Sequence, residues 1–122
     1  MEINWNNKEP IYLQLRDRLV ELILDGALQE GEALPSVRQI SSEQRINPIT
    51  VSKALQLLVD EELVEKRRGL GMYVIVGAKA KLSKQERSRF LEVEWPQIAD
   101  RIARLGLRAD ELLLRIKPYK DE

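Results

Sequence analysis

The stretch RINPITVSKALQLLVDEELVEKRRGLGMYV, residues 45–74, predicts a helix followed by a basic hairpin. Asn47 followed by Pro48 is a strong helix start, because asparagine caps the first backbone amides and proline fits the first turn. Apolar side chains then recur at helical spacing, which predicts one buried face. That face comprises Val51, Leu55 and Leu58, with Ala54 close to it. The opposite face carries Ile49, Ser52, Lys53 and Gln56.

The hairpin begins at Leu63 and turns over Arg68–Gly71, with Tyr73–Val76 expected as its second strand. Its glycines permit a tight turn that can come close to another backbone. Lys66 and Arg67 alternate across the first strand, so only one of them needs to face a partner. Arg68, at the turn, is the better candidate for a contact.

Two helices are predicted before residue 45. The first follows Pro10, shows an apolar face from Tyr12 to Ile23, and stops at Gly26. The second covers about residues 36–44, with Ser36 as its N-cap. The order helix, helix, helix, hairpin is that of a winged helix-turn-helix, in which the last helix enters the major groove of DNA. The fold class is therefore mainly α with a small β-hairpin.

Composition excludes several kinds of site. The 122 residues include no cysteine and no histidine, which removes disulfides, thiolate metal sites and histidine general-base catalysis. We find no nucleophile–base pair and no metal constellation. The sequence GLG lies in a hairpin and opens no helix, so it is not a nucleotide-binding fingerprint. The sequence predicts neither an enzyme nor a cofactor.

Charge is divided unevenly along the chain although the net charge is zero. Residues 1–77 hold nine basic and twelve acidic side chains, whereas residues 78–122 hold eleven and eight. Binding to DNA by the first segment would therefore need a local basic face. No apolar run is long enough for a membrane span, and the N-terminus lacks a signal-peptide core, so we expect a soluble, cytoplasmic protein.

The second segment, residues 78–122, is predicted to be helical after a small basic joint, GAKAK. Pro96 is expected to kink the helix or to start a new one. The segment carries too many apolar side chains for an exposed helix. They could pack back on the first segment, but we expect them to pair with a second chain. The candidate interface consists of Trp95, Ile98, Ile102, Leu105, Leu112 and Leu113.

A family resemblance emerges from several motifs taken together. The segments PIYLQLRDRLVELILDGAL, LPSVR, NPITVSKAL and RRGLGMYV resemble the DNA-binding domain of the GntR family of bacterial transcription regulators. The likeness covers about residues 10–77. The short helical tail is similar to that of the YtrA-type subgroup, which has no large effector domain. A small-molecule effector could still act between the tail helices, where Trp95 with Phe90 or Tyr119 would form either a pocket or, as we expect, core packing.

The resemblance implies a function and a set of contacts. Members act as homodimers on near-palindromic operators in double-stranded DNA, often repressing their own operon, which in this subgroup commonly encodes an ABC transporter. Residues 1–77 would form the DNA-binding domain and residues 78–122 the dimerisation region. The positions that match DNA-contacting positions of the family are Ser36, Arg38, Asn47, Pro48, Ile49, Thr50, Ser52, Lys53, Arg68, Gly69 and Gly71.

The chain departs from the family pattern at Arg45 and Glu62, where many members have glycine. Both sites often need a left-handed backbone, which costs a residue other than glycine about 1 kcal/mol. Arg45 also adds a candidate phosphate contact.

Some alternatives remain open. Arg38 could pair with Glu43 instead of DNA, and the basic side chains of residues 79–89 could form a solvated face. The whole domain could also be a protein-interaction adaptor, since winged helices serve that purpose as well; an adaptor would show no salt-dependent DNA binding.

Overall fold

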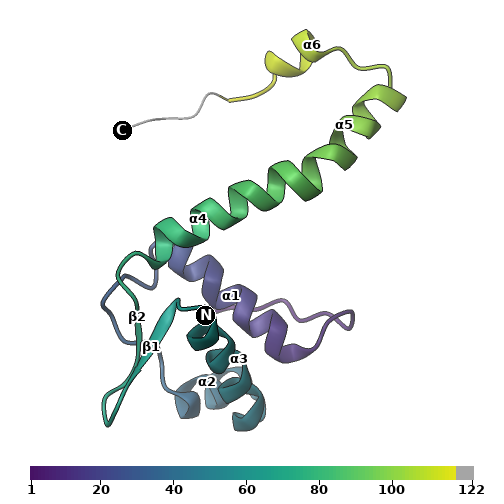
Figure 1. The fold of residues 1–122 in the computed structure, drawn as a ribbon. Coiled ribbons are helices and arrows are strands. Elements are labelled where there is room, and N and C mark those ends of the chain that lie inside the picture. Colours follow the sequence, from purple (N-terminus) through teal and green to yellow (C-terminus); the bar gives the residue numbers. More distant parts are fainter. Residues whose placement is uncertain (118–122) are drawn as a thin grey trace. The chain divides into compact units, whose positions relative to one another are not determined.

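The chain forms three helices and a hairpin, followed by a helical segment, in the order that the sequence predicts (Figure 1). The structure is a computed structural model and describes residues 1–117. The elements are α1 (Ile11–Asp25), α2 (Val37–Gln44), α3 (Pro48–Asp60), β1 (Val64–Arg67), β2 (Gly71–Val74), α4 (Ala78–Arg89), the π-helix η1 (Phe90–Glu94), α5 (Trp95–Arg104) and α6 (Ala109–Leu113). They divide into two units, Met1–Lys84 and Gln85–Glu122.

The helix boundaries of the first unit follow the predicted caps. The Ser36 hydroxyl accepts a hydrogen bond from the Gln39 amide at 3.0 Å, and the Asn47 carbonyl oxygen Oδ1 accepts one from the Ile49 amide at 2.9 Å. Both bonds satisfy amides that the first helical turn leaves unpaired. Gly26 ends α1 in the left-handed conformation, with φ of 84°. Local sequence signals therefore fix where α1 ends and where α2 and α3 begin.

Within residues 1–117, two residues other than glycine adopt the left-handed conformation, at the sites where the sequence departs from the pattern of the family that it resembles. Arg45 ends α2 with φ of 56°, and Glu62 precedes β1 with φ of 59°. Both expectations are confirmed. Each residue costs about 1 kcal/mol relative to glycine at the same position. The turns keep their geometry because the core on either side holds them.

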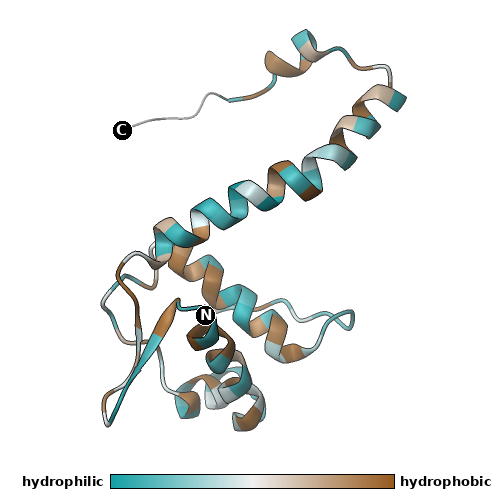
Figure 2. Ribbon diagram, in the orientation of Figure 1, coloured by the Kyte–Doolittle hydropathy of each residue, from teal (hydrophilic) through white to brown (hydrophobic). Residues whose placement is uncertain are grey.

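The core of the first unit lies between α1, α2, α3 and the hairpin. The predicted face of α3 is buried, including Val51 and Leu58, which are both fully shielded. Brown and teal segments alternate along α1 and α3, as expected for helices with one apolar face (Figure 2). The largest fully buried side chains are Leu15, Leu19, Ile23, Ile40, Leu55, Leu58, Leu63 and Leu82. Burying one face of α3 leaves its other face to solvent.

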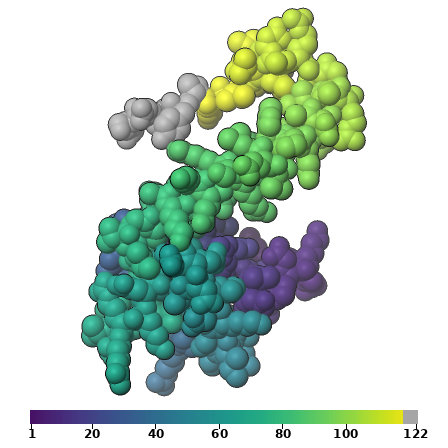
Figure 3. All heavy atoms as spheres, viewed as in Figure 1, coloured from purple at the N-terminus to yellow at the C-terminus, as the bar shows by residue number. Residues whose placement is uncertain are grey.

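The hairpin differs from the prediction in its second strand. β2 covers Gly71–Val74, and the predicted strand Tyr73–Val76 lies two residues too late. The reason is the tight turn: Arg67 pairs with Gly71, and the Leu70 amide donates to the Arg67 carbonyl oxygen at 2.9 Å. Strand pairing therefore resumes at Gly71. The hairpin projects from the first unit as a wing, seen at the lower left of the space-filling view (Figure 3).

The predicted joint GAKAK is also wrong, because α4 begins within it at Ala78. Alanine and lysine favour helix, and Ala78 lies four residues before Leu82 on the same helix face. Both side chains are buried in the core of the first unit. The first turns of α4 thus belong to the first unit. The division of roles between residues 1–77 and 78–122 remains a proposal.

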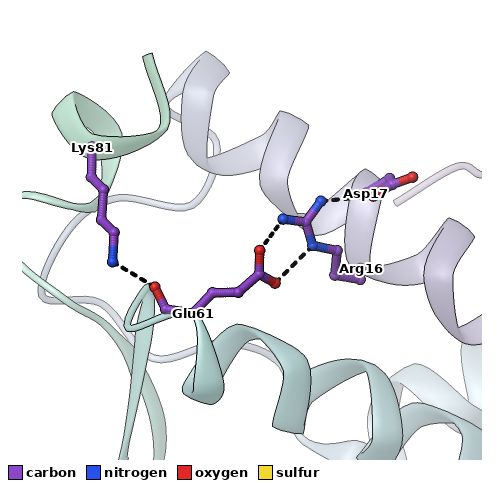
Figure 4. Close-up of polar contacts among 4 residues, drawn as sticks. All are labelled: Arg16, Asp17, Glu61 and Lys81. Carbon is purple, nitrogen blue, oxygen red and sulfur yellow. Dashed lines mark hydrogen bonds and ion pairs between the residues drawn. The ribbon is translucent and has the colours of Figure 1, made fainter. Parts of the chain in front are cut away.

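A polar cluster connects α1, the end of α3 and α4 within the first unit (Figure 4). Arg16 donates to both carboxylate oxygens of Glu61, from Nε at 2.9 Å and from a terminal nitrogen. It also donates to Asp17 at 2.8 Å. These acceptors, Glu61 first, raise the pKa of Arg16 above its usual value against the opposing effect of burial. Lys81 Nζ donates to the backbone oxygen of Glu61 at 2.7 Å, so one residue connects three helices.

The helical segment changes its form at the predicted proline. α5 begins at Trp95 with Pro96 in its first turn, directly after the π-helix η1. The backbone is helical at both Arg89 and Glu94, so the expected fresh helix start is wrong, and the proline instead follows a π-helical turn. Gly106, with φ of 68°, ends α5, and α6 follows at Ala109. Tyr119 lies outside the described residues. Within residues 1–117, no helix is long and apolar enough to cross a membrane.

The strain at Glu62 predicts a stabilising substitution. Glu62→Gly should raise the free energy of unfolding by about 1 kcal/mol, measured by urea denaturation, because glycine adopts positive φ without cost. The lost ion pair with Lys81 is long, at 3.8 Å, and exposed, so it offsets little. The control Glu65→Gly lies within β1, where glycine weakens a strand, and should lower stability. A destabilised Glu62→Gly protein would show that the left-handed turn is not strained.

Candidate nucleic-acid interface

The outer face of α3 is a continuous exposed stripe, as the sequence predicts. Ile49, Ser52, Lys53 and Gln56 are all exposed and follow one another at spacings of three, one and three residues, on one side of the helix. Ile49 keeps 76% of its surface accessible. Thr50 is half-buried at the border of this stripe. The stripe begins at the N-terminal end of α3, the end that reads base edges in helix-turn-helix proteins.

A groove of about 440 Å³ lies between α3, the start of α2 and the wing. It brings together four of the predicted contact residues, which come from three separate elements: Ser36, Ser52, Gly69 and Gly71. Gln56, Lys66 and Arg67 also line it, although none of them was among the predicted contacts. Gln56 could have been found from its position one turn after Ser52 on the exposed stripe. Lys66 and Arg67 both line the groove, so the alternation of side chains along the first strand does not select one of them.

The residues that cap α2 and α3 already use their side chains in hydrogen bonds within the protein. Ser36 and Asn47 use their oxygens for capping. The amide nitrogen of Asn47 has no protein acceptor within residues 1–117, so it stays free to donate outward. Pro48, next to it, is exposed. Asn47 therefore combines a structural bond with a free donor at the end of the exposed stripe.

Basic side chains of the reading region mostly lack a carboxylate partner. Within residues 1–117, Arg67 is the one cation between residues 38 and 68 in an ion pair, with Glu65 at 2.9 Å. Glu43, the alternative partner for Arg38, instead accepts from Gln39 at 3.3 Å. The cations between residues 38 and 68 that have no ion pair with any residue of the range 1–117 are Arg38, Arg45, Lys53, Lys66 and Arg68. Unpaired charges of one sign suit a polyanion.

Lys53 does not line the groove, although it belongs to the predicted contact set. Its Nζ lies 4.0 Å from the centre of the Tyr12 ring, at the start of α1. Tyr12 was predicted only as part of the apolar face of α1, and it does pack against the core. The contact joins residues that are distant in sequence, so no local pattern indicates it.

The wing tip requires its glycines for backbone conformation. Gly69 has φ of 77° and Gly71 has φ of 100°, while a Cβ at either position would meet no atom within 4 Å. Glycine is thus needed for the left-handed backbone and not for space. Leu70 between them is 67% exposed. Arg68 lies in the same turn without an ion pair among the described residues, so the tip presents one free charge.

The six predicted interface residues of the tail keep accessible surface in the single chain. Trp95 and Ile98 are 45% and 40% exposed, and Leu105 and Leu113 exceed 60%. Ile102 and Leu112 are half-buried. Phe90, Leu91 and Val93 of η1 are exposed as well. The described part of the second unit thus leaves many apolar side chains without cover.

Comparison with a family profile gives an independent result. The profile of the family described as "Bacterial regulatory proteins, gntR family" matches residues 11–74. These residues run from the start of α1 to the end of β2, which is the region that contains the exposed stripe and the groove. The match covers more than half of the chain.

Comparisons with individual relatives agree with the match to the family profile. The HTH-type transcriptional repressor YtrA of Bacillus subtilis is 39% identical over 82 residues, which are 67% of this chain and 63% of YtrA. The uncharacterized HTH-type transcriptional regulator YhcF of the same organism is 26% identical over 99% of this chain and 98% of its own. A transcriptional regulator from Oenococcus oeni superposes with a TM-score of 0.74 at 27% identity, over 90% of both chains. These relatives are regulators and not enzymes.

The substitution Asn47→Asp distinguishes the helix-capping role of this residue from its proposed contact with DNA. Aspartate caps as well as asparagine and suits the positive end of the helix, so stability should change by less than about 0.5 kcal/mol. The new carboxylate should weaken binding to duplex DNA, because it adds a negative charge at the exposed end of α3, which a polyanion repels. Thermal denaturation and a gel shift measure the two effects. The companion Asn47→Ala should lose about 1 kcal/mol of stability with its cap. Wild-type DNA affinity in Asn47→Asp would remove Asn47 from the interface.

Proposed function

Because the chain belongs to the GntR family of bacterial regulatory proteins, we propose that it is a sequence-specific transcriptional repressor that binds a near-palindromic DNA operator as a homodimer. The observation that supports this best is the surface around α3. An exposed helix face lies beside a groove closed by a wing, and among residues 1–117 all the cations of this region except Arg67 lack a carboxylate partner. Such a surface fits a nucleic-acid backbone and the base edges next to it.

Each part of the surface has a distinct task in this proposal. The first turns of α3, with Asn47, Ile49 and Thr50, enter the major groove and read base edges. Ser36 and Arg38, at the start of α2, hold phosphate. The wing tip with Arg68 lies against the neighbouring backbone or the minor groove. Because phosphate contacts position the protein and base contacts specify sequence, affinity and specificity depend on different residues.

The exposed apolar residues of the second unit support the dimer. A second copy would cover Trp95, Ile98 and Leu105, which an isolated chain leaves accessible. A two-fold dimer uses the same surface twice and matches the two halves of a palindromic operator. The second unit then sets the separation of the two recognition helices.

Regulation would act through the same unit. A small molecule bound between the tail helices would change DNA affinity only if it favoured one spacing of the recognition helices over another. In keeping with the YtrA-type resemblance, we propose that the controlled operon is the protein's own and that it includes an ABC transporter.

A gel shift with DNA from upstream of the protein's own gene tests the proposal, together with selection from random duplexes. Binding should be specific, and the logarithm of the affinity should fall linearly with the logarithm of salt concentration. Arg38→Ala should weaken binding and lower the slope by about 0.9, one phosphate contact. Arg18→Ala is the matched control, because it removes the same charge from α1, which does not line the groove, and Arg18 already pairs with Glu21. A dimeric wild-type protein that retards no DNA at low salt would falsify the regulator and favour the adaptor.

Sedimentation of Trp95→Asp tests the dimer. A carboxylate in a buried apolar interface is costly, so the variant should sediment as a monomer while the first unit stays folded. Gln97→Asp, on the same helix but polar and exposed in the wild type, should remain dimeric. Dimers that persist in Trp95→Asp would place the interface elsewhere.

A further inference from the structure

The contact between Lys53 and Tyr12 remains unexplained by the helix-turn-helix and the wing. Lys53 is an exposed residue of α3, and its Nζ lies 4.0 Å from the centre of the Tyr12 ring. A cation over an aromatic face is attracted to the negative charge of the ring. Tyr12 is half-buried and packs against the core, so the ring is a fixed support for a flexible side chain.

We propose that Tyr12 is a positioning residue for DNA binding, whose ring holds the Lys53 ammonium group ready for a backbone phosphate. The inference rests on the proposed function. The lysine ammonium group presents three N–H donors. Its long, flexible side chain must lose rotamer entropy when it binds a ligand. The ring imposes much of that order before DNA arrives and accepts no strong hydrogen bond, so the donors stay available. Binding to a preorganised group loses less affinity to ordering.

A second cation–aromatic pair among residues 1–117 shows why charge balance matters. Arg67 lies 4.0 Å from the centre of the Tyr73 ring, in the wing. Its guanidinium also donates to Glu65 at 2.9 Å, so its charge is already neutralised. Lys53 has an aromatic support but no ion pair with any residue of the range 1–117. Only the Lys53 pair therefore combines a fixed position with a free charge.

The site extends the interface to α1. The exposed stripe of α3 begins with Ile49, and Lys53 follows four residues later on the same side. The groove lies on the side of Ser52 and Gln56, toward the wing. Lys53 is turned instead toward Tyr12, so it would meet a different phosphate from those along the groove. Tyr12 thereby gives α1 a role in DNA binding beyond packing.

Substitutions at Tyr12 in the full-length protein separate the ring from the hydroxyl. The probe is a short duplex selected by the wild-type protein. Tyr12→Leu removes the aromatic face and should weaken binding roughly two- to fivefold. Tyr12→Phe keeps the face and should bind like the wild type. In a Lys53→Met background, Tyr12→Leu should have no further effect. The ring current should also shift the Lys53 side-chain proton resonances in the free wild type and Tyr12→Phe, but not in Tyr12→Leu.

Each other outcome overturns the inference in a recognisable way. Equal binding by wild type and Tyr12→Leu would show that the ring is unnecessary. A loss in Tyr12→Phe equal to that in Tyr12→Leu would assign the effect to the hydroxyl. A loss that persists in the Lys53→Met background would mean that Tyr12 acts independently of Lys53. Failure of the wild type to bind any DNA would overturn the proposed function as well, whereas these three results leave it standing.

Discussion

The buried face of α3 is the constraint on which the rest of the first unit depends. Val51, Ala54, Leu55 and Leu58 are almost completely shielded from solvent, and they allow only one rotation of the helix about its axis. Turning α3 by one residue would expose part of this stripe and bury Ser52 or Lys53 in its place, which costs free energy in both directions. The outward direction of the exposed stripe is therefore a consequence of core packing. Sequence specificity, in the proposed function, depends on side chains that contribute nothing to that packing.

Glu61 adds a second connection at the other end of the same helix. Its side chain accepts from Arg16 of α1, and its backbone oxygen accepts from Lys81 of α4. Because Arg16 donates to both carboxylate oxygens of Glu61, the pair fixes the relative orientation of the two side chains as well as the distance between them. At its N-terminal end α3 is free to approach a ligand, and at its C-terminal end it is held by two other helices. A helix held in this way suits a task that needs an exposed, accurately placed first turn.

Much of the first unit was predictable because its signals are local. Caps at Ser36 and Asn47, the stop at Gly26 and the apolar spacing of α3 each depend on a few adjacent residues. The left-handed turns at Arg45 and Glu62 were expected on different grounds, from the family resemblance, because many members have glycine at these two positions. The predictions were wrong where a tertiary contact determines the first residue of an element. β2 starts at Gly71 because of the pairing with Arg67, and α4 starts at Ala78 because Ala78 and Leu82 have a core to bury against.

The candidate site was predictable to the same extent and for the same reason. Periodicity placed Ser52, Lys53 and Gln56 on one exposed face, but it could not divide that face between two neighbours. The fold makes the division: Ser52 and Gln56 border the groove under the wing, while Lys53 lies over the Tyr12 ring. Likewise, adjacent cations Arg67 and Arg68 look equivalent in the sequence, yet Glu65 neutralises the first. Which charges remain free for a phosphate is thus a property of side-chain pairing in three dimensions. A list of basic residues cannot supply this information. In the proposed function, the pairing leaves Arg68 and Lys53 among the charges available to DNA and removes Arg67 from them.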